Sequence, residues 1–442
     1  MSRPVRRKQV VIIGGGFSGL TAGYELAKAG IGATVLEKEP ELGGLAASFE
    51  IAGVPIEKFY HHWFTGDTHV LRLIDELGMG SKLRVHKTRT GLYCRGRSFR
   101  LSTPMDLLRF SPLRLRDRIR LGLLTLRARR VRDWRQLEEQ TAEQWLIDMA
   151  GRGVYDVLWE PLLRGKFGRW APEISAVWIW NKLVLRGSSR TKGGAEALAY
   201  LEGGFSALAD ALAGSIAARG GTVRTDCAVD GLLVAGGRVV GVRVGQEELA
   251  ADAVIATPSL PVVADLVAPH VHGDYSDRLR RVSYLANVCL VLELSESLSE
   301  YYWLNVADAE FPYVGVIEHT NFEPPQVYGG RHIVYLSKYL PPDEPLFRMA
   351  DAEVLGFSIP HIERLFPQFA ASWIQGYHVF RALHSQPVVV RRYGSLAPAA
   401  QTPLGGLYLC TMAQVYPEDR GTNYAVRNAA ELAGKMVASL RG

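Results

Sequence analysis

The sequence predicts an α/β protein organised around a nucleotide-binding βαβ unit, and three observations lead to this class. Residues 10–13 read Val-Val-Ile-Ile, a β-branched apolar run typical of a buried parallel strand. Glycines follow at positions 14, 16 and 19, and a stretch with helical character comes next. A second apolar run, 33–36, then ends on the carboxylate Glu37. This order of strand, glycine turn, helix, strand and acid indicates a Rossmann-like unit that binds a dinucleotide.

The glycine positions each have a physical reason. Gly14 permits a tight turn, Gly16 leaves room for a diphosphate against the backbone, and Gly19 lets the helix pack closely on the strand. The helix N-terminus, at Phe17 and Ser18, would present unpaired N–H groups to the phosphates. Glu37 would accept hydrogen bonds from ribose hydroxyls. The alternative is a glycine-rich turn without a ligand, which this context disfavours.

A second glycine pair decides which dinucleotide to expect. In an NAD enzyme the second strand normally leads into another helix, but here it leads into "KEPELGGLAASFE". This pattern resembles the flavoprotein family that includes amine oxidases, protoporphyrinogen oxidase, phytoene desaturase and UDP-galactopyranose mutase. The resemblance implies FAD, bound non-covalently, with the second glycine pair beside the diphosphate and the flavin. The further cofactor-binding residues expected here are Lys38, Gly43, Gly44, Leu45 and Ala46.

The resemblance covers essentially the whole chain and implies a discontinuous, GR2-type FAD-binding domain. Later segments support it, because a Gly-Gly-Phe turn opens a helix at 203–205 and "ADAVIATPS" at 251–259 reads as a buried strand. We expect the FAD-binding domain to consist of residues 1–60, 195–275 and 393–442. Residues 61–194 and 276–392 would form an α+β substrate-binding domain with a mixed sheet and a helical part.

The composition is that of an ordinary globular protein. The chain has 442 residues, of which 48% are hydrophobic and 22% charged, enough for two domains with sizeable cores. The four cysteines (94, 227, 289 and 410) form no C-x-x-C pair, which argues against a metal site or a disulfide framework and suits the cytosol. The basic first residues lack the apolar core of a secretion signal, and no apolar run approaches the length of a membrane span. A cytoplasmic protein is therefore expected.

Two adjacent histidines in "EKFYHHWF", residues 57–64, form the first candidate catalytic group. The segment resembles the "KYGPHIFHT" loop of UDP-galactopyranose mutase, which places His62 on the mutase histidine near the flavin. His61 takes the proline position, and Thr65 replaces the mutase's second histidine, so the match is partial. A histidine there could donate a hydrogen bond to the flavin or transfer a proton near neutral pH. The alternative is a packing role for these side chains.

A second candidate group lies in "GVIEHTNF", residues 315–322. Strand alternation would put His319 and Asn321 on one face and Glu318 on the other. A strand that turns polar groups towards a flavin would position a substrate, whereas a solvent-facing loop is the alternative.

The third candidate group precedes the closing helix, in "MAQVYPEDRGTNYAVRNA". In the family that this chain resembles, the loop contacts the flavin ring. The usual Gly-Asp pair is replaced here by residues of the run Cys410-Thr411-Met412. Gly421 and Thr422 open the helix, so their N–H groups could reach the pyrimidine oxygen of the flavin, where negative charge builds on reduction. Arg420 could stabilise the same charge or bind a substrate phosphate.

An arginine-rich stretch accounts for the basic character of the chain. Residues 109–135 contain ten arginines and two acids, a net charge of +8 in a protein whose total is +6. Leucines and an isoleucine recur at helical spacing among them. Such a helix indicates contact with anionic lipid, as in peripheral attachment to the inner membrane face, or with a phosphorylated substrate. An exposed, salt-bridged helix is disfavoured by the scarcity of acids, and nucleic acid by the scarcity of stacking aromatics.

Three functions compete at this stage. The first is an FAD-dependent oxidoreductase resembling amine and protoporphyrinogen oxidases, which transfers a hydride between flavin N5 and a small or lipid-linked substrate. The second resembles UDP-galactopyranose mutase, a redox-neutral isomerase of a lipid- or nucleotide-linked sugar. The third is a non-catalytic, FAD-bound membrane scaffold, which the polar groups expected around the flavin disfavour.

Overall fold

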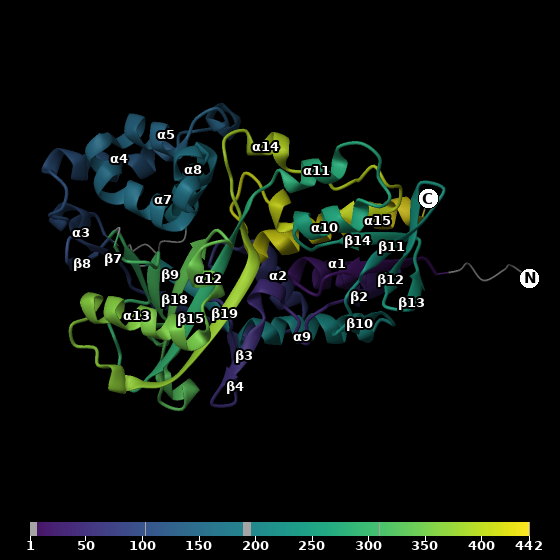
Figure 1. Cartoon of the computed structure of the whole chain (residues 1–442), viewed down its shortest axis with the longest axis horizontal. Helices are drawn as coiled ribbons and strands as arrows, with labels where there is room; N and C mark the ends of the chain where they lie inside the picture. The colour runs from purple at the N-terminus through teal and green to yellow at the C-terminus, as the bar shows by residue number, and fades with distance from the viewer. Residues whose placement is uncertain (1–6, 102, 189–195, 309, 442) are drawn as a thin grey trace, which may run out of the picture.

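The computed structural model describes residues 7–101, 103–188, 196–308 and 310–441. Figure 1 shows an elongated molecule with the two chain termini at one end and a group of helices, α3 to α8, at the other. The expected domain edges at residue 1 and at residues 194–195 lie outside the described residues.

A five-stranded parallel sheet confirms the α/β class. Its order is β10-β2-β1-β14-β20, and every neighbouring pair is parallel. The sheet draws on three separated stretches of chain, because β1 and β2 are N-terminal, β10 and β14 lie in the middle, and β20 lies near the C-terminus. The strands are β1 (Gln9–Ile13), β2 (Gly32–Leu36), β10 (Thr222–Arg224), β14 (Ala253–Ala256) and β20 (Leu407–Leu409).

Both faces of the parallel sheet are covered, which explains why its strands read as continuous apolar runs. Val10 and Ile12 share a core with α1 (Phe17–Lys28), α9 (Gly204–Ala217) and α15 (Thr422–Arg441). Val11 and Ile13 belong to a second core, together with α10 (Leu260–Val267) and an antiparallel meander. The meander consists of β11 (Gly231–Ala235), β12 (Arg238–Val244) and β13 (Glu247–Ala250).

A seven-stranded mixed sheet lies below the helices α7 and α8 in the view of Figure 1. Its order is β19-β15-β18-β17-β16-β7-β8, and only the pair β16–β7 is parallel. Its strands are β7 (Thr90–Cys94), β8 (Arg97–Arg100), β15 (Tyr284–Leu294), β16 (Trp303–Val306), β17 (Gly315–Glu318), β18 (His332–Leu340) and β19 (Ile374–Pro387). The helices α12 (Pro345–Arg348) and α13 (Asp351–Leu365) follow β18. This sheet supplies one wall of the cavity described below.

Smaller elements connect the two sheets. A three-stranded sheet has the order β5-β9-β6, from β5 (Trp63–Phe64), β6 (Leu83–Thr88) and β9 (Glu196–Leu201). The hairpin β3 (Ser48–Ile51) and β4 (Val54–Glu57) precedes it, and α2 (Thr68–Glu76) follows β5. Two further short helices are α11 (Tyr275–Arg280), before β15, and α14 (Tyr393–Leu396), before β20.

The helical lobe lies above the mixed sheet in Figure 1, and both are at the end of the molecule away from the nucleotide-binding sheet. Thr141 begins α5 through a capping box with Gln144. The lobe contains α3 (Pro104–Arg109), α4 (Leu115–Ala128), α5 (Ala142–Ala150), α6 (Arg152–Val154), α7 (Glu160–Phe167) and α8 (Ala176–Ser188). No helix among the described residues combines the length and the apolar character that a membrane crossing requires.

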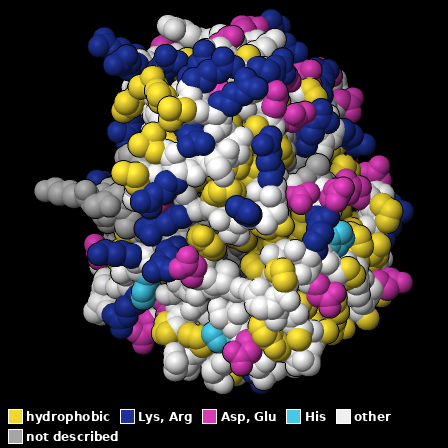
Figure 2. Space-filling model, turned by 90° about the vertical axis from the view of Figure 1, so that its left-hand side faces the viewer, with side chains coloured by type: hydrophobic (Ala, Val, Ile, Leu, Met, Phe, Trp, Pro, Cys, Tyr) yellow, Lys and Arg dark blue, Asp and Glu magenta, His cyan; other side chains and the backbone are white. Residues whose placement is uncertain are grey.

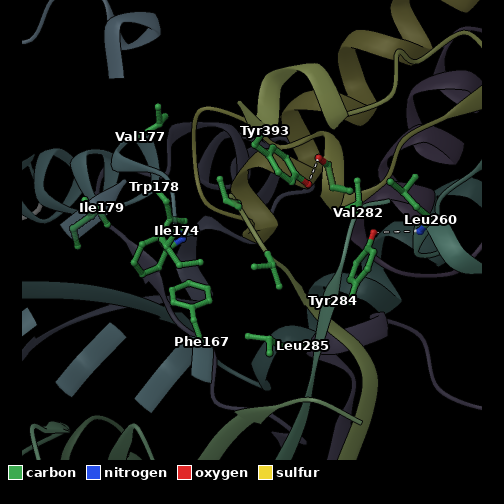
Figure 3. Packing of buried hydrophobic residues seen from close by; sticks show 14 of the residues in the cluster. Phe167, Ile174, Val177, Trp178, Ile179, Leu260, Val282, Tyr284, Leu285 and Tyr393 are labelled. Carbon is green, nitrogen blue, oxygen red and sulfur yellow. Dashed lines mark hydrogen bonds between the residues drawn. The ribbon is translucent and has the colours of Figure 1, made fainter. Parts of the chain in front are cut away.

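The helical lobe and the nucleotide-binding sheet share a hydrophobic core. Figure 3 shows Phe167 and Trp178 from the lobe on one side, and Leu260, Tyr284 and Tyr393 on the other. Two hydrogen bonds fix aromatic rings within this core. The Leu260 N–H donates to the Tyr284 hydroxyl at 3.2 Å, and the Tyr393 hydroxyl donates to the Ala413 carbonyl at 2.8 Å. Continuous packing of this kind holds the lobe in place relative to the sheet.

Candidate functional site

The first glycine turn has the predicted geometry. Gly14 has a φ of +103°, and its N–H donates to the Leu36 carbonyl at 2.8 Å, which joins the turn to β2. A Cβ on Gly19 would lie 1.9 Å from the Gly14 carbonyl oxygen, so only glycine lets α1 begin this close to the strand.

The start of α1 suits an anion. Gly16 is the N-cap and provides no side chain to accept hydrogen bonds, and the first helical turn contains no acid. The first bond of the helix runs from the Leu20 N–H to the Gly16 carbonyl at 2.9 Å. The N–H groups of Phe17, Ser18 and Gly19 therefore belong to the helix start, where they lack partners within the helix and carry partial positive charge.

Glu37 and the second glycine pair lie against this turn. Glu37 is buried at the end of β2, and its Oε2 accepts the Gly15 N–H at 2.6 Å. The Gly43 N–H donates to the Gly15 carbonyl at 2.9 Å, and a Cβ on Gly44 would come within 3.3 Å of the Gly16 Cα. The two glycine segments thus form one cradle of bare backbone beside a buried carboxylate, which fits a dinucleotide.

The other residues predicted to bind the cofactor differ in how deeply they are buried. Ala46 is buried and Leu45 half-buried, in the short turn that follows the glycine pair. Lys38 is exposed and pairs with Glu39, with 3.0 Å between Nζ and Oε1. The Ser18 hydroxyl forms a hydrogen bond with the Cys410 thiol. The first residue of the unusual Cys410-Thr411-Met412 run therefore lies at the start of α1. Burial raises the pKa of this thiol to about 12.

A chain of aromatic contacts connects this cradle to the start of α15. Phe17 meets the edge of the Phe205 ring at 6.1 Å between centroids, and Trp63 stacks on the same ring at 4.0 Å. The Trp63 indole N–H donates to the Thr422 hydroxyl at 2.7 Å. Since Phe17, Phe205 and Thr422 stand in the first turns of α1, α9 and α15, three helix N-termini converge here.

Next to this convergence lies a cavity of about 320 Å³, a volume within the range of small-molecule sites. It is enclosed by α7 and α8 of the lobe, by β16 and β18 of the mixed sheet and by the segment before α15. Most of its lining is apolar or aromatic: Tyr60, Phe64, Trp159, Leu162, Leu163, Trp178, Ile179, Leu183, Leu185, Leu198, Tyr302, Trp303, Val314, Tyr339 and Tyr424. The predicted residues His61, His62, Arg420, Gly421 and Thr422 also line it.

The two histidines in the cavity wall are held differently. The His61 Nδ1 lies 2.6 Å from the Phe59 carbonyl, and since a carbonyl only accepts, Nδ1 carries the proton. Burial, together with Arg420, lowers the pKa of His61 to about 4, so its Nε2 is a neutral acceptor. The His62 Nδ1 lies 2.9 Å from the Tyr302 hydroxyl. His62 thus lines the cavity with its ring oriented by Tyr302.

Arg420 is fixed by two side chains. Its Nε donates to the Gln386 Oε1 at 3.0 Å, and its Nη2 donates to the Tyr339 hydroxyl at 2.8 Å. Tyr60 hydrogen-bonds with Tyr339, and burial raises the pKa of Tyr60 well above its usual range. The guanidinium is thus a positioned positive charge immediately before the first turn of α15.

A second group of charges lies beside Arg420 in the cavity wall. The Lys182 Nζ lies 2.5 Å from the Asp419 Oδ2. Burial alone would raise the pKa of Asp419, but Lys182, Lys166 and Arg420 together hold it below its usual range. Lys166 lies over the rings of Trp178 and Tyr339, at 4.9 and 5.1 Å from their centroids.

The structure does not bring His319 and Asn321 to the cavity. β17 ends at Glu318, and residues 319–321 form a single 3₁₀ turn, so the predicted alternation along a strand is wrong. His319 is buried against Tyr328, whose hydroxyl lies 2.8 Å from Nε2, and burial lowers its pKa to about 3. The Asn321 amide donates to the carbonyls of Ser299 and Tyr301 at 2.7 and 3.0 Å. Both side chains are engaged within the protein.

Comparison with known proteins decides the family. The profile of the flavin-containing amine oxidoreductases matches residues 17–418. The chain belongs to this family. This is a family of flavin-containing oxidoreductases, which confirms the resemblance given by the glycine segments and supports FAD as the cofactor. FAD supplies a flavin that accepts or donates a hydride, and the cradle of Gly14–Gly16, Gly43–Gly44 and Glu37 fits its dinucleotide portion.

The individual proteins that the chain resembles have low sequence identity to it. Hydroxyneurosporene desaturase of Rubrivivax gelatinosus is 26% identical over 359 residues, which span 71% of this chain and 63% of that protein. The match therefore covers less than two thirds of the desaturase. A protoporphyrinogen oxidase candidate from Exiguobacterium sp. 255-15 has a TM-score of 0.78 at 18% identity, covering 99% of this chain and all of that one. Reduced UDP-galactopyranose mutase has a TM-score of 0.74 at 15% identity, covering 97% and 96%. At such identities these two likenesses show a shared fold.

Sequence reasoning missed two lysines that line the cavity, Lys166 and Lys182, which together with Arg420 form its positive wall. Lys182 is a single lysine within the apolar stretch "AVWIWNKLVL", and Lys166 follows the apolar residues of α7. A lone cation within the apolar face of a helix signals either a snorkelling side chain or a buried partner. Here the partner of Lys182 is Asp419, which is more than two hundred residues away in the chain.

Proposed function

We propose that this flavoprotein dehydrogenates a substrate that combines a largely apolar body with an anionic group. The observation that carries the proposal is the composition of the cavity, in which aromatic and aliphatic walls surround Lys166, Lys182 and Arg420. Apolar walls bind by excluding water, and a few placed charges fix the orientation of the ligand.

The charges argue against an amine substrate. Three cations and two acids, Asp67 and Asp419, line the cavity, which leaves an excess of one positive charge. Asp419 is already engaged by Lys182 at 2.5 Å. A protonated amine would meet repulsion there, whereas a carboxylate or phosphate would be attracted.

The chain's own groups then have distinct tasks. Arg420, together with the N–H groups of Gly421 and Thr422 at the start of α15, would stabilise negative charge that develops on the cofactor side of the cavity. His62, oriented by Tyr302, would accept the proton that leaves the substrate. His61 stays neutral above about pH 5 and would serve as a hydrogen-bond acceptor. The aromatic walls would keep water away from the reacting carbon.

Relatives with related names support this chemistry. By their names, the hydroxyneurosporene desaturase and the protoporphyrinogen oxidase candidate are enzymes that remove hydrogen from their substrates. A mutase activity is the second candidate, because His62 reaches the cavity from the loop that resembles the mutase loop, and the positive wall would suit a sugar–nucleotide diphosphate. Under that candidate the flavin ends each cycle in its starting redox state.

Anaerobic flavin spectroscopy tests the proposal. The purified holoprotein is mixed, without oxygen, with protoporphyrinogen, hydroxyneurosporene, cyclohexylamine or UDP-galactopyranose. Bleaching of the oxidised flavin band by protoporphyrinogen, which carries carboxylates on an apolar body, followed by recovery with a quinone, is the expected result, and the uncharged hydroxyneurosporene should bleach the flavin more weakly. Bleaching by the amine alone would overturn the proposal. Conversion of the sugar nucleotide only after dithionite reduction, with no net electron flow, would establish the mutase activity instead.

A matched pair of variants tests the positive wall. Lys166→Met is expected to raise KM for an acidic substrate about tenfold and to leave the KM of its methyl ester unchanged, since only the acid loses a charge partner. Lys435→Met, on the exposed side of α15, changes the net charge equally and should change neither value. Equal loss for acid and ester in Lys166→Met would contradict an anionic substrate.

A further inference from the structure

An exposed apolar row on α3 and α4 has no place in the function proposed above. Six of the twelve large apolar side chains that are exposed among the described residues lie on these two helices. They are Met105, Leu108, Leu115, Ile119, Leu123 and Leu126, each 39–62% exposed, and together they are called the α3–α4 row. Scattered exposed leucines are ordinary, but a concentration of this kind marks an interaction surface.

The row is separate from the face with which α4 packs on the protein. The inward face of α4 carries Leu124 and Ala128, both fully buried, and the Ala128 carbonyl accepts the Trp180 indole N–H of α8 at 2.9 Å. The outward residues 115, 119, 123 and 126 recur every three or four positions, so they form a continuous stripe along about 17 Å of helix. Folding of the lobe therefore does not require them to be apolar.

Arginines flank the row on all sides. Of the ten arginines in residues 109–135, nine are exposed, and the half-buried Arg118 donates to the Leu113 carbonyl. The two acids of the segment are Asp117, which is buried, and Asp133. Arg95, Arg97 and Arg100 of the neighbouring β7–β8 hairpin extend the same charge. Figure 2 shows Lys and Arg side chains spread over the upper part of this end of the molecule, with hydrophobic side chains among them.

We propose that the α3–α4 row and its arginines dock the protein onto an anionic phospholipid bilayer. The aliphatic side chains would enter the boundary between headgroups and acyl chains, while the guanidinium groups bind the phosphates. Nucleic acid fits less well, because it is bound through exposed stacking aromatics and Phe110 is fully buried while Trp134 packs against Tyr416. An acidic protein partner would use the charges but would leave the apolar side chains of the α3–α4 row without a role.

Docking would place the cavity wall next to the lipid. α4 is tied to α8 by the Trp180 hydrogen bond, and α8 provides Trp178, Ile179 and Lys182 to the cavity. The docking proposal rests on the surface alone and holds whether or not the proposed dehydrogenase reaction is correct.

Vesicle flotation with the holoprotein tests this proposal. Vesicles of phosphatidylcholine alone are compared with vesicles containing 30% phosphatidylglycerol, at low and high salt. Three variants are compared with the wild type: L115Q/I119Q/L123Q in the row, R114Q/R116Q/R130Q beside it, and R278Q/R280Q/R281Q on α11 as the charge-matched control. All substituted side chains are exposed, and the flavin spectrum together with the thermal transition shows that each variant is folded.

The expected result is flotation of the wild type with the anionic vesicles only. The row variant should no longer float with the anionic vesicles, and the neighbouring arginine variant should bind them about a hundredfold more weakly. The α11 control should bind them like the wild type. Absence of binding to anionic vesicles by the wild type would overturn the proposal, as would equal weakening by the α11 control. A wild-type dimer that the row variant abolishes, without any vesicle binding, would show that the row is a self-association surface instead.

Discussion

The ammonium group of Lys182 lies 2.5 Å from the carboxylate of Asp419, and this pair joins α8 of the helical lobe to the segment that leads into α15. The contact connects the part of the chain that walls the cavity to the part that faces the flavin in this family. Because Asp419 is only 7% exposed and Lys182 about one third exposed, the pair is neither a surface ion pair nor a fully buried one.

Asp419→Asn is expected to lower the free energy of unfolding by about 2 kcal/mol, since Lys182, Lys166 and Arg420 would lose the carboxylate that they share. Urea unfolding followed by flavin fluorescence measures this. The double variant Lys182→Met with Asp419→Asn should be less destabilised than Asp419→Asn alone, because one uncompensated charge is removed. Equal destabilisation of the single and double variants would contradict coupling between the two residues.

Gly19→Ala is expected to abolish FAD binding. The added Cβ would stand 1.9 Å from the Gly14 carbonyl oxygen, so α1 must move away from the turn that holds the diphosphate. The preparation should be colourless, and added FAD should not be retained on gel filtration. Gly434→Ala on α15 is the control, because no atom lies within 4 Å of its Cβ position and the yellow colour should remain. A yellow Gly19→Ala protein would show that this glycine is not required.

The first βαβ unit and its glycine turn could be predicted because each depends on a local pattern. A strand, a turn with fixed glycine spacing and a helix start are encoded within about thirty residues, and tertiary contacts only place them.

The cavity could be predicted only in part because its walls come from distant segments. His62 and Arg420 were found through local resemblance, whereas Lys182 and Asp419 are separated along the chain and carry no motif. The strand prediction failed at His319 because β17 ends one residue earlier, and a shift of one position decides which face a side chain takes. The boundaries between the two predicted domains stay predictions.

Glu57 is expected to make stability fall as pH rises. It is fully buried, and burial raises its pKa from an ordinary value of 4.5 to about 7, although the Phe205 N–H and the Tyr200 hydroxyl donate to it at 2.8 Å. A raised pKa in the folded state means that its contribution is complete below pH 4.5 and is lost as pH rises to about 7. A change of this size corresponds to about 3 kcal/mol.

Urea unfolding at pH 5 and at pH 8 measures this dependence. Glu57→Gln should show a smaller loss of stability between the two pH values than the wild type, because a neutral amide does not titrate. Glu318, whose pKa burial also raises to about 7, will leave a residual slope in the variant. Glu50→Gln, at an exposed position on β3, should behave like the wild type. Identical slopes for Glu57→Gln and the wild type would refute the assignment.

Thr422→Val is expected to cost about 1–2 kcal/mol of stability, because it leaves the buried indole N–H of Trp63 without its acceptor at 2.7 Å. Thr422→Ser keeps the hydroxyl and should unfold within a few tenths of a kcal/mol of the wild type. The near-ultraviolet circular dichroism of Trp63, which stacks on Phe205, provides a local readout alongside thermal unfolding. If Val and Ser at this position were equally stable, the hydrogen bond would not hold the start of α15.

His62→Gln is expected to lower kcat by about 10²- to 10³-fold with little change in KM, because proton acceptance is lost while the cavity keeps its shape. The measurement uses the substrate identified by anaerobic bleaching, and the flavin content per chain should equal that of the wild type. His319→Gln is the matched control, since His319 is buried against Tyr328 and does not line the cavity. It should lower the thermal stability and leave kcat per bound flavin unchanged. A fall in kcat for His319→Gln that matches the fall for His62→Gln would place the catalytic proton transfer elsewhere.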